Sequence, residues 1–255
     1  MREPHLVRLD GSPDCMADAI YEHPRLAALY DPLDPDRSDL DVYADIAHEL
    51  AAHRVLDVGC GTGTFALLLV ARGFEVVGVD PAGESLLVAK SKPGAERVHW
   101  IHGDVRMLPS LTVDLATMTG NAAQAIVDDL DWAATLAGIH DALRPDGHLV
   151  FETRDPAREA WREWTRATTH EIAAVDGVGR VEHWGDLVDV SLPLVTFRWT
   201  FVFEDGEILT SDSTLRFRER DEVASTLAAN GYVVEDVRDA PDRPGREFVF
   251  VARRL

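Results

Sequence analysis

Three glycines lie within five residues of the stretch VLDVGCGTGTF, residues 55–65. A glycine-rich turn that joins a strand to a helix lets a ligand approach the backbone closely and meet the positive end of the helix. A dinucleotide fingerprint needs glycines at relative positions one, three and six. Here the glycines are Gly59, Gly61 and Gly63, and Thr64 occupies the sixth position. The spacing therefore favours another ligand, and a dinucleotide such as NAD remains the alternative.

Three acidic residues accompany the glycines. Asp57 lies two residues before the first glycine, where it would repel a pyrophosphate but attract an amine or a sulfonium. Its alternative role is to cap the following helix. Asp80 ends the next apolar run, VVGVD, where a carboxylate accepts hydrogen bonds from both ribose hydroxyls of a nucleoside. Asp104 ends the run after that, within reach of an adenine amino group, so the three acids predict a site for a cationic adenosine ligand.

A parallel sheet would bring these residues together. From about residue 54 to residue 153, short β-branched runs alternate with helical segments, which predicts a parallel sheet covered by helices on both faces. Residues 17–52 show helical spacing. After residue 170 the pattern changes to period-two strands, with turn signals at 176–177 and 205–206. We therefore predict an α/β fold with a helical lid over 1–52, a cofactor-binding domain over 53–155 and 219–255, and an inserted antiparallel lobe over 156–218.

Composition narrows the class of protein. The 255 residues include 45 acidic and 25 basic side chains, a formal charge of −20 that would repel a phosphate backbone, so nucleic acid is not an expected partner. No apolar run reaches the roughly 20 residues that a bilayer span requires, and no signal peptide is evident. Cys15 and Cys60 lack the paired spacing of a metal site. The sequence predicts a soluble cytoplasmic protein with reduced thiols, no metal and no membrane contact.

Five segments occur in a familiar order: VLDVGCGTG, VVGVDP, GDVRMLP, VDLATMTGNAAQ and LRPDGHLVFE. This series resembles the class I S-adenosylmethionine-dependent methyltransferases. The resemblance implies a Rossmann-like seven-stranded sheet with an antiparallel last strand, and a hairpin of the last two strands at one sheet edge. It also implies S-adenosylmethionine as cofactor, S-adenosylhomocysteine as product, and in-line methyl transfer to a nitrogen or oxygen of a small molecule without a metal.

The resemblance further implies a set of cofactor contacts. Asp57 would support the loop or the cofactor amine, Asp80 would take the ribose hydroxyls, and Asp104 would meet the adenine amino group. Residues 119–124 would border the reacting methyl. The implied cofactor residues are Asp57, Gly59, Cys60, Gly61, Gly63, Asp80, Pro81, Asp104, Val105, Arg106, Thr119, Gly120, Asn121 and Gln124.

The lid and the lobe are similar to those of aminosugar N-methyltransferases. Tyr30 and Tyr43, in LYDPLDPDRSDLDVYADIA, fall at the lid tyrosines that cover the cofactor or touch the acceptor, with core packing as the alternative. Those enzymes carry a histidine after the fourth strand, whereas this chain has Gln124. Glutamine cannot act as a base at neutral pH, so Gln124 would at most orient the acceptor.

The acceptor site is predicted from the lobe. Arg154 follows the fifth parallel strand, at the sheet edge where open α/β sheets bind ligands. Trp161 and Trp164 share a helical face, which predicts either packing on the lobe or an aromatic cage. The predicted substrate contacts are Arg154, Trp161, Trp164, His183 and Trp184, and the candidate catalytic groups are His183, Tyr30 and Gln124. A homodimer is possible through a lobe edge strand, and a non-catalytic cofactor-binding module is the alternative function.

Overall fold

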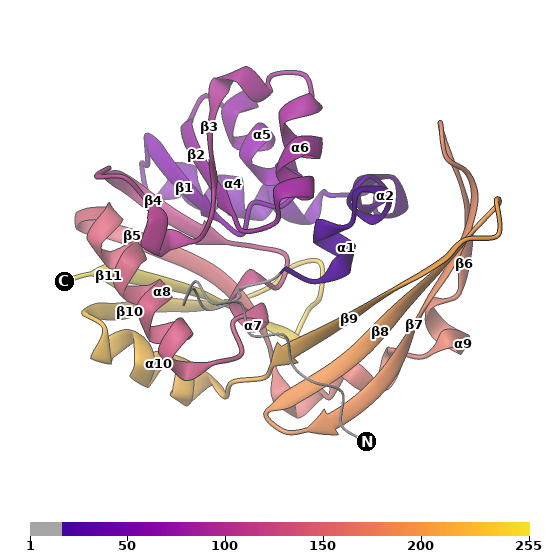
Figure 1. Cartoon of the computed structure of the whole chain (residues 1–255). Helices are drawn as coiled ribbons and strands as arrows, with labels where there is room; N and C mark the ends of the chain where they lie inside the picture. The colour runs from indigo at the N-terminus through magenta and orange to yellow at the C-terminus, as the bar shows by residue number, and fades with distance from the viewer. Residues whose placement is uncertain (1–16) are drawn as a thin grey trace, which may run out of the picture.

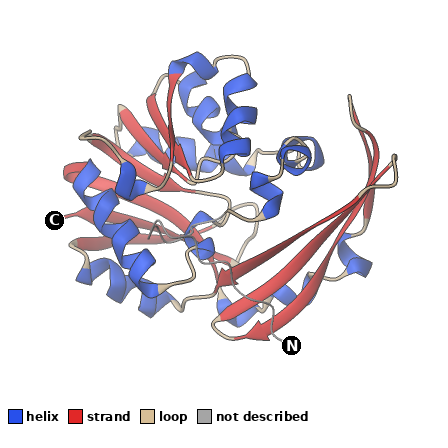
Figure 2. Cartoon of the chain, viewed as in Figure 1, coloured by secondary structure: helices blue, strands red, loops and turns tan. Residues whose placement is uncertain are grey.

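The structure is a computed structural model that describes residues 17–255. Its larger sheet has seven strands in the order β10-β11-β5-β4-β1-β2-β3, with β11 antiparallel to both of its neighbours (Figures 1 and 2). The strands are β1 (Arg54–Val58), β2 (Glu75–Asp80), β3 (Val98–His102), β4 (Val113–Met118), β5 (Leu143–Arg154), β10 (Tyr232–Asp239) and β11 (Glu247–Arg254). The predicted α/β sheet with its antiparallel last strand is confirmed, as is the closing hairpin of β10 and β11.

Helices cover both faces of this sheet. On one face lie α4 (Asp39–Glu49), α5 (Thr64–Ala71) and α6 (Gly83–Ser91), and on the other lie α8 (Asp129–Ala142) and α10 (Arg220–Ala229) (Figure 1). Each face has its own apolar core, because strands buried on both sides carry apolar residues in continuous runs. The Asp128 carboxylate caps α8 by accepting hydrogen bonds from the Leu130 and Asp131 N–H groups at 2.7 and 3.1 Å.

A second sheet of four antiparallel strands is inserted between β5 and α10. It consists of β6 (Glu171–Val175), β7 (Gly179–Ser191), β8 (Leu194–Phe203) and β9 (Ile208–Arg216), in that spatial order. Gly177 and Gly206 have φ angles of +77° and +87°, so both predicted turn signals lie at hairpins where glycine is favoured. The predicted antiparallel lobe is therefore present.

Short helices connect the longer elements. The first three are α1 (Ala19–Glu22), α2 (Pro24–Ala27) and α3 (Tyr30–Leu33), and α1 and α2 lie between the central sheet and the antiparallel sheet in Figure 1. We call residues 19–33 the lid segment. The remaining short elements are α7 (Ala122–Ala125), α9 (Arg166–Thr169) and four 3₁₀ turns at Ala95–Arg97, Val105–Met107, Pro156–Arg158 and Ala160–Glu163.

The predicted lid over residues 1–52 divides into unlike parts. Residues 1–16, with Cys15, lie outside the described residues. Helix α4 is not positioned as a lid, because Leu40, Tyr43 and Ala44 are buried in the same core as Val55 of β1. Its apolar residues at helical spacing face the sheet, and their burial holds the helix there. Of the described part of the predicted lid, α1 and α2 lie between the two sheets in Figure 1.

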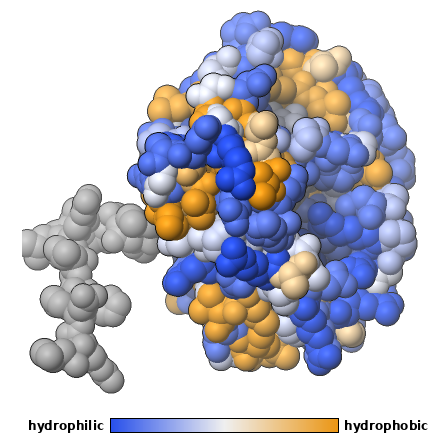
Figure 3. Space-filling view, turned by 90° about the vertical axis from the view of Figure 1, so that its right-hand side faces the viewer, coloured by the Kyte–Doolittle hydropathy of each residue, from blue (hydrophilic) through white to orange (hydrophobic). Residues whose placement is uncertain are grey.

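The surface is mainly polar. Figure 3 shows a largely hydrophilic face on which apolar side chains gather in separate patches. Exposed apolar residues near the turn between β7 and β8 are Leu187, Val188, Val190 and Leu192. Across residues 17–255, the structure contains no helix both long enough and apolar enough to cross a membrane.

Candidate functional site

The glycine loop has a conformation that only glycine adopts easily. Gly59, Gly61 and Gly63 have φ angles of +73°, +53° and +77°, in the left-handed region. A Cβ atom on Gly59 would lie 2.8 Å from Ala122 Cβ, and one on Gly63 would lie 2.5 Å from the Trp100 ring. A Cβ on Gly61 would meet nothing within 4 Å. Two of the glycines are therefore required by close packing, and the third borders open space.

Asp57 is buried directly below this loop. Its side chain is 1% exposed, and Oδ1 accepts a weak hydrogen bond from the Thr117 hydroxyl at 3.3 Å. The other oxygen, Oδ2, is buried and has no hydrogen-bond partner among residues 17–255. Burial raises the pKa of Asp57 to about 7. Helix α5 begins after Gly63 without a side-chain cap, so Asp57 does not cap it.

Asp80 closes the loop from the next strand. Its Oδ2 accepts from the Gly61 N–H and its Oδ1 from the Ala82 N–H, both at 2.7 Å. Burial raises the pKa of Asp80, against the effect of these two bonds. Each carboxylate oxygen can accept a second hydrogen bond, so both oxygens retain capacity for a ligand hydroxyl.

Asp104 differs from the other two acids because it has a cationic partner. Its carboxylate accepts from the Arg106 N–H at 2.8 Å and from Arg106 Nε at 2.9 Å. These contacts lower the pKa of Asp104. Val105 is buried in the core beside α8, and the Pro81 carbonyl lies 3.0 Å from His102 Nε2. The predicted adenine end of the site is thus already neutralised.

Cys60 packs inside the glycine loop. It is buried, and its sulfur lies 3.0 Å from the position that a Cβ on Gly78 of β2 would take. Burial raises the pKa of the thiol, so the sulfur remains protonated. The Cys60 N–H donates to the Val79 carbonyl at 3.2 Å. Its side chain fills space, and only its backbone shares the loop.

The loop after β4 brings Gln124 to a structural position. Gln124 Oε1 accepts from the Arg154 N–H at 3.1 Å, and Nε2 donates to the Arg216 carbonyl at 3.3 Å. The side chain is 2% exposed. Both ends of the amide therefore tie β5 to β9, which argues against the predicted orientation of an acceptor by Gln124.

Glu152 is a buried carboxyl that the sequence analysis did not assign. Its Oε1 accepts from the Gly120 and Asn121 N–H groups at 2.6 and 3.3 Å, and so holds the loop that follows Thr119. Within the described chain, Oε2 is buried without a hydrogen bond, and the Tyr43 hydroxyl lies near the carboxyl. Burial raises the pKa of Glu152 to about 7, and burial beside this acid raises the pKa of Tyr43. In the sequence, its position at the end of LRPDGHLVFE was the signal that could have identified Glu152 as a site residue.

Arg154 lies at the carboxyl end of β5, as predicted. Its side chain is largely buried, with Nε 3.4 Å from Glu247 Oε1 and the guanidinium carbon 5.5 Å from the centre of the Trp164 ring. Burial lowers the pKa of Arg154. Glu247 also pairs with Arg243 at 2.7 Å, so the carboxylate is shared between two arginines.

The two predicted tryptophans have different environments. Trp161 is 4% exposed and packs edge-on against Phe217 with ring centres 4.6 Å apart, in a core with Val195 and Leu215. Trp164 follows the 3₁₀ turn and is only half-buried, between Phe197 and Arg154. The packing alternative therefore describes Trp161, and of the two tryptophans Trp164 is the one beside Arg154.

His183 and Trp184 lie on opposite faces of β7 because successive side chains of a strand alternate. His183 is buried against Phe201, its Nε2 has no hydrogen-bond partner within residues 17–255, and burial lowers its pKa. Its ring is thus held neutral on the face that the lid segment covers. Trp184 faces away, under Arg166 and hydrogen-bonded to Asp186 at 2.8 Å. The predicted pair is not brought together.

Tyr21, which the sequence analysis did not assign to the site, packs against Tyr30. The rings of Tyr21 and Tyr30 have centres 5.7 Å apart, and burial raises the pKa of both hydroxyls. Tyr21 is anchored by its carbonyl, which accepts from the Ser85 hydroxyl at 2.8 Å. Tyr30 and Tyr43 are on separate elements, and only Tyr43 lies beside Glu152.

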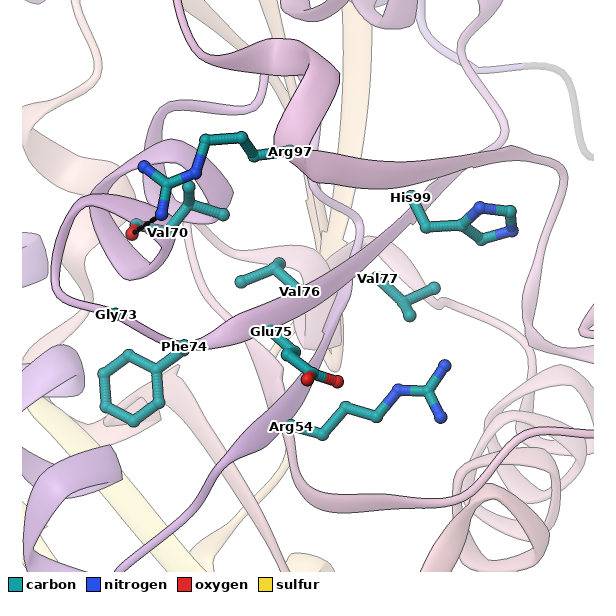
Figure 4. A pocket seen from close by; sticks show the side chains of 9 residues that line it. All are labelled: Arg54, Val70, Gly73, Phe74, Glu75, Val76, Val77, Arg97 and His99. Carbon is teal, nitrogen blue, oxygen red and sulfur yellow. Dashed lines mark hydrogen bonds between the residues drawn. The ribbon is translucent and has the colours of Figure 1, made fainter.

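A cavity of about 410 Å³ opens at the opposite sheet edge, at the amino ends of β1 and β2 (Figure 4). Arg97 beside it donates to the Val70 carbonyl at 3.1 Å. None of the predicted site residues lines this cavity; it is lined by Arg54, Val70, Gly73, Phe74, Glu75, Val76, Val77, Arg97 and His99. We therefore place the candidate site at the carboxyl edge.

Comparison with known proteins shows what the chain is similar to. Residues 55–147 match the family described as a methyltransferase domain. Over 109 residues the chain is 35% identical to the cypemycin N-terminal methyltransferase of a Streptomyces species. The aligned region covers 42% of this chain and 44% of that protein. The chain spans about half the length of the curated relatives that it matches.

Two solved structures share the fold over most of the chain. The sugar N-methyltransferase KedS8 from a Streptoalloteichus species has a TM-score of 0.72 at 20% identity, covering 98% of this chain and 99% of that one. CalS10, an amino pentose methyltransferase from Micromonospora echinaspora, has a TM-score of 0.65 at 24% identity, covering 89% and 95%.

The fold and the site together define a Rossmann-like protein whose glycine loop and buried acids lie at the carboxyl edge of its sheet. The comparisons give the particular class. The chain has the class I methyltransferase fold, and the resemblance to S-adenosylmethionine-dependent methyltransferases is confirmed by the domain match over residues 55–147.

Proposed function

We propose that the protein is an S-adenosylmethionine-dependent methyltransferase that acts on a nitrogen or oxygen of a small molecule. The observation that carries the proposal is the orphaned Oδ2 of buried Asp57 beneath a glycine loop that borders open space at Gly61. A buried carboxylate without a partner is costly, and an ammonium or sulfonium ligand would relieve that cost. The pyrophosphate of NAD would increase it.

The order of polar residues along the sheet edge supports the same ligand. Asp104 follows β3, Asp80 ends β2 and the glycine loop follows β1, so adenine, ribose and methionine contacts occur on consecutive neighbouring strands. The loop after β4 comes next, and β5 with Glu152 and Arg154 follows it. The acceptor would then lie beside β5, under the lid segment and the antiparallel sheet.

The bound cofactor supplies an activated methyl on a sulfonium, which leaves the protein the tasks of binding, alignment and water exclusion. Asp57 would hold the amine, and Asp80 the ribose. Neutral His183 is available to take a proton from the acceptor. KedS8 is a sugar N-methyltransferase by its printed name, and the unpartnered Glu152 Oε2 suits a cationic amine. We therefore favour nitrogen as the accepting atom.

Titration calorimetry with S-adenosylmethionine, S-adenosylhomocysteine and NAD tests the cofactor. Binding of NAD alone would reject the proposal. A screen of amino sugars, amino acids, phenols and natural-product alcohols that reads release of S-adenosylhomocysteine tests catalysis. Cofactor binding with no turnover on any of these acceptors would favour a non-catalytic binding module instead.

A further inference from the structure

Asp31 ties the lid segment to the glycine loop. Its Oδ1 accepts from the Thr62 hydroxyl at 2.7 Å and from the Thr64 hydroxyl at 3.0 Å, and its Oδ2 lies 2.6 Å from Lys92 Nζ. Lys92 also donates to the Thr64 hydroxyl at 3.1 Å. We call Asp31, Thr62, Thr64 and Lys92 the clasp.

The clasp joins three segments that are distant in the chain. Thr62 belongs to the glycine loop, Thr64 is the first residue of α5, and Lys92 immediately follows α6. The amino end of α5 and the Lys92 ammonium both favour a carboxylate at this point. Asp31 and Lys92 have side chains 28% and 23% exposed, so water can replace their contacts.

The lid segment is attached differently to the antiparallel sheet. Leu26 and Leu29 are each 1% exposed and belong to an apolar cluster with Val181, Phe201 and Phe203. That cluster includes no residue of the central sheet or its helices within the described part of the chain. On this side Arg25 also pairs with Asp205 at 2.9 Å.

These two attachments differ in strength. Separating the apolar cluster would expose large side chains to water, whereas opening the clasp exchanges polar contacts for water contacts at a lower net cost. The part of the lid segment around Asp31 should therefore separate from the glycine loop, while Leu26 and Leu29 remain on the antiparallel sheet. Tyr30 precedes Asp31 and would move with it, whereas the Tyr21 carbonyl accepts from the Ser85 hydroxyl of α6 at 2.8 Å, so Tyr21 stays bonded to the central domain.

We propose that the clasp holds the lid segment over the cofactor and that its opening sets the rate at which the cofactor leaves. This inference rests on the proposed function. Asp31 is then a positioning residue: it touches the loop and the helix that surround the ligand and keeps Tyr30 above the cleft. Thr64, which occupies the sixth position of a dinucleotide fingerprint, supplies a hydroxyl to the clasp where glycine would supply none.

The test compares Asp31→Asn with Asp34→Asn in the full chain. Asp34 lies three residues further on, is 68% exposed, and is 3.9 Å from Arg37, so its variant changes the same charge outside the clasp. Stopped-flow displacement measures dissociation of S-adenosylhomocysteine. Hydrogen exchange over residues 19–33 is measured without ligand. We expect Asp31→Asn to accelerate dissociation about tenfold and to raise that exchange, because one charged, partly exposed contact is lost. Asp34→Asn should change neither.

Lys92→Met is a second variant, which keeps the carboxylate of Asp31 and is available if Asp31→Asn does not fold. It should show the same two changes, faster dissociation and greater exchange. Wild-type dissociation and exchange in a folded clasp variant would overturn the inference while leaving the proposed function intact. A wild-type protein that binds neither S-adenosylmethionine nor S-adenosylhomocysteine would instead refute the proposed function, and the role of the clasp in cofactor release with it.

Discussion

Replacing Asp57 by asparagine should stabilise the ligand-free protein and weaken cofactor binding. Burial raises the pKa of Asp57 from 3.8 to about 7. Because the folded-state pKa is above the unfolded value, the contribution to stability is complete below about pH 4 and is lost as the pH rises to about 7. At 1.36 kcal/mol per pKa unit, the raised pKa lowers the free energy of unfolding by about 4 kcal/mol at pH 8 and, because the unfolded chain is already ionised, by about 2 kcal/mol at pH 5, as upper bounds.

Asparagine avoids this loss but brings its own cost. Its amide N–H groups would occupy the place of Oδ2, where they find no acceptor, and burying these unpaired donors costs about 1–3 kcal/mol of stability. Relative to wild type, the free energy of unfolding should therefore rise by about 1–3 kcal/mol at pH 8 and change little at pH 5. Glu152 titrates in the same range, but comparison at a fixed pH cancels its contribution. Affinity for S-adenosylhomocysteine should fall more than tenfold, about 1.4 kcal/mol or more, because its ammonium loses the carboxylate.

Urea unfolding of ligand-free protein at both pH values, with calorimetric titration at pH 8, measures these effects. Asp114→Asn is the matched control. Asp114 lies on β4 toward the opposite edge, accepts from the His53 and Arg54 N–H groups at 2.9 Å each, and has a lowered pKa. Its variant should lose stability at pH 8 and bind normally. Equal loss of stability at both pH values in Asp57→Asn, with unchanged affinity, would show that Asp57 only accepts from Thr117.

Three further changes test other parts of the site. Asp80→Ala should weaken S-adenosylhomocysteine binding more than tenfold by calorimetry, about 1.4 kcal/mol or more, and unchanged affinity would remove Asp80 from the site. Glu152→Gln should lower kcat on an amine acceptor about a hundredfold at saturating cofactor, because a neutral amide cannot balance the positive charge of the ammonium group. A wild-type kcat would argue against a role of Glu152 in holding the acceptor amine. Trp161→Ala should cost about 3–5 kcal/mol in urea unfolding, since the ring is buried on Phe217, and a loss below 1 kcal/mol would contradict that packing.

The grouping of three acidic residues at one sheet edge was predictable because they occur at fixed points of local structure. Asp57, Asp80 and Asp104 each lie within two residues of the carboxyl end of a parallel strand, and parallel strands present these ends at one edge. The hairpin turns were predictable for a similar reason, because glycine follows aspartate at positions 177 and 206.

The acceptor half depends on contacts between distant segments. Gln124 resembles a site residue in sequence, but its amide is bonded to Arg154 and to Arg216, which is 92 residues away. Glu152 and Asp31 lay within segments already recognised, yet their partners could not be deduced from spacing. Trp184 differs from His183 only in strand parity, and the bulge in β7 between residues 187 and 189 shows how one residue can alter that parity.

The pairing of acidic and basic side chains explains why the proposed site should prefer a cationic adenosine ligand. Three of its acids have basic partners: Asp31 with Lys92, Asp104 with Arg106, and Glu247 with Arg243. Asp57 and Asp80 are 1% and 7% exposed and, among residues 17–255, form no ion pair. Unpaired acids therefore lie at the ribose and methionine ends of the proposed site, and Glu152, which likewise forms no ion pair in the described chain, lies at its acceptor end. A ligand with a sulfonium and an ammonium compensates this charge, whereas a pyrophosphate at the same glycine loop would add to it.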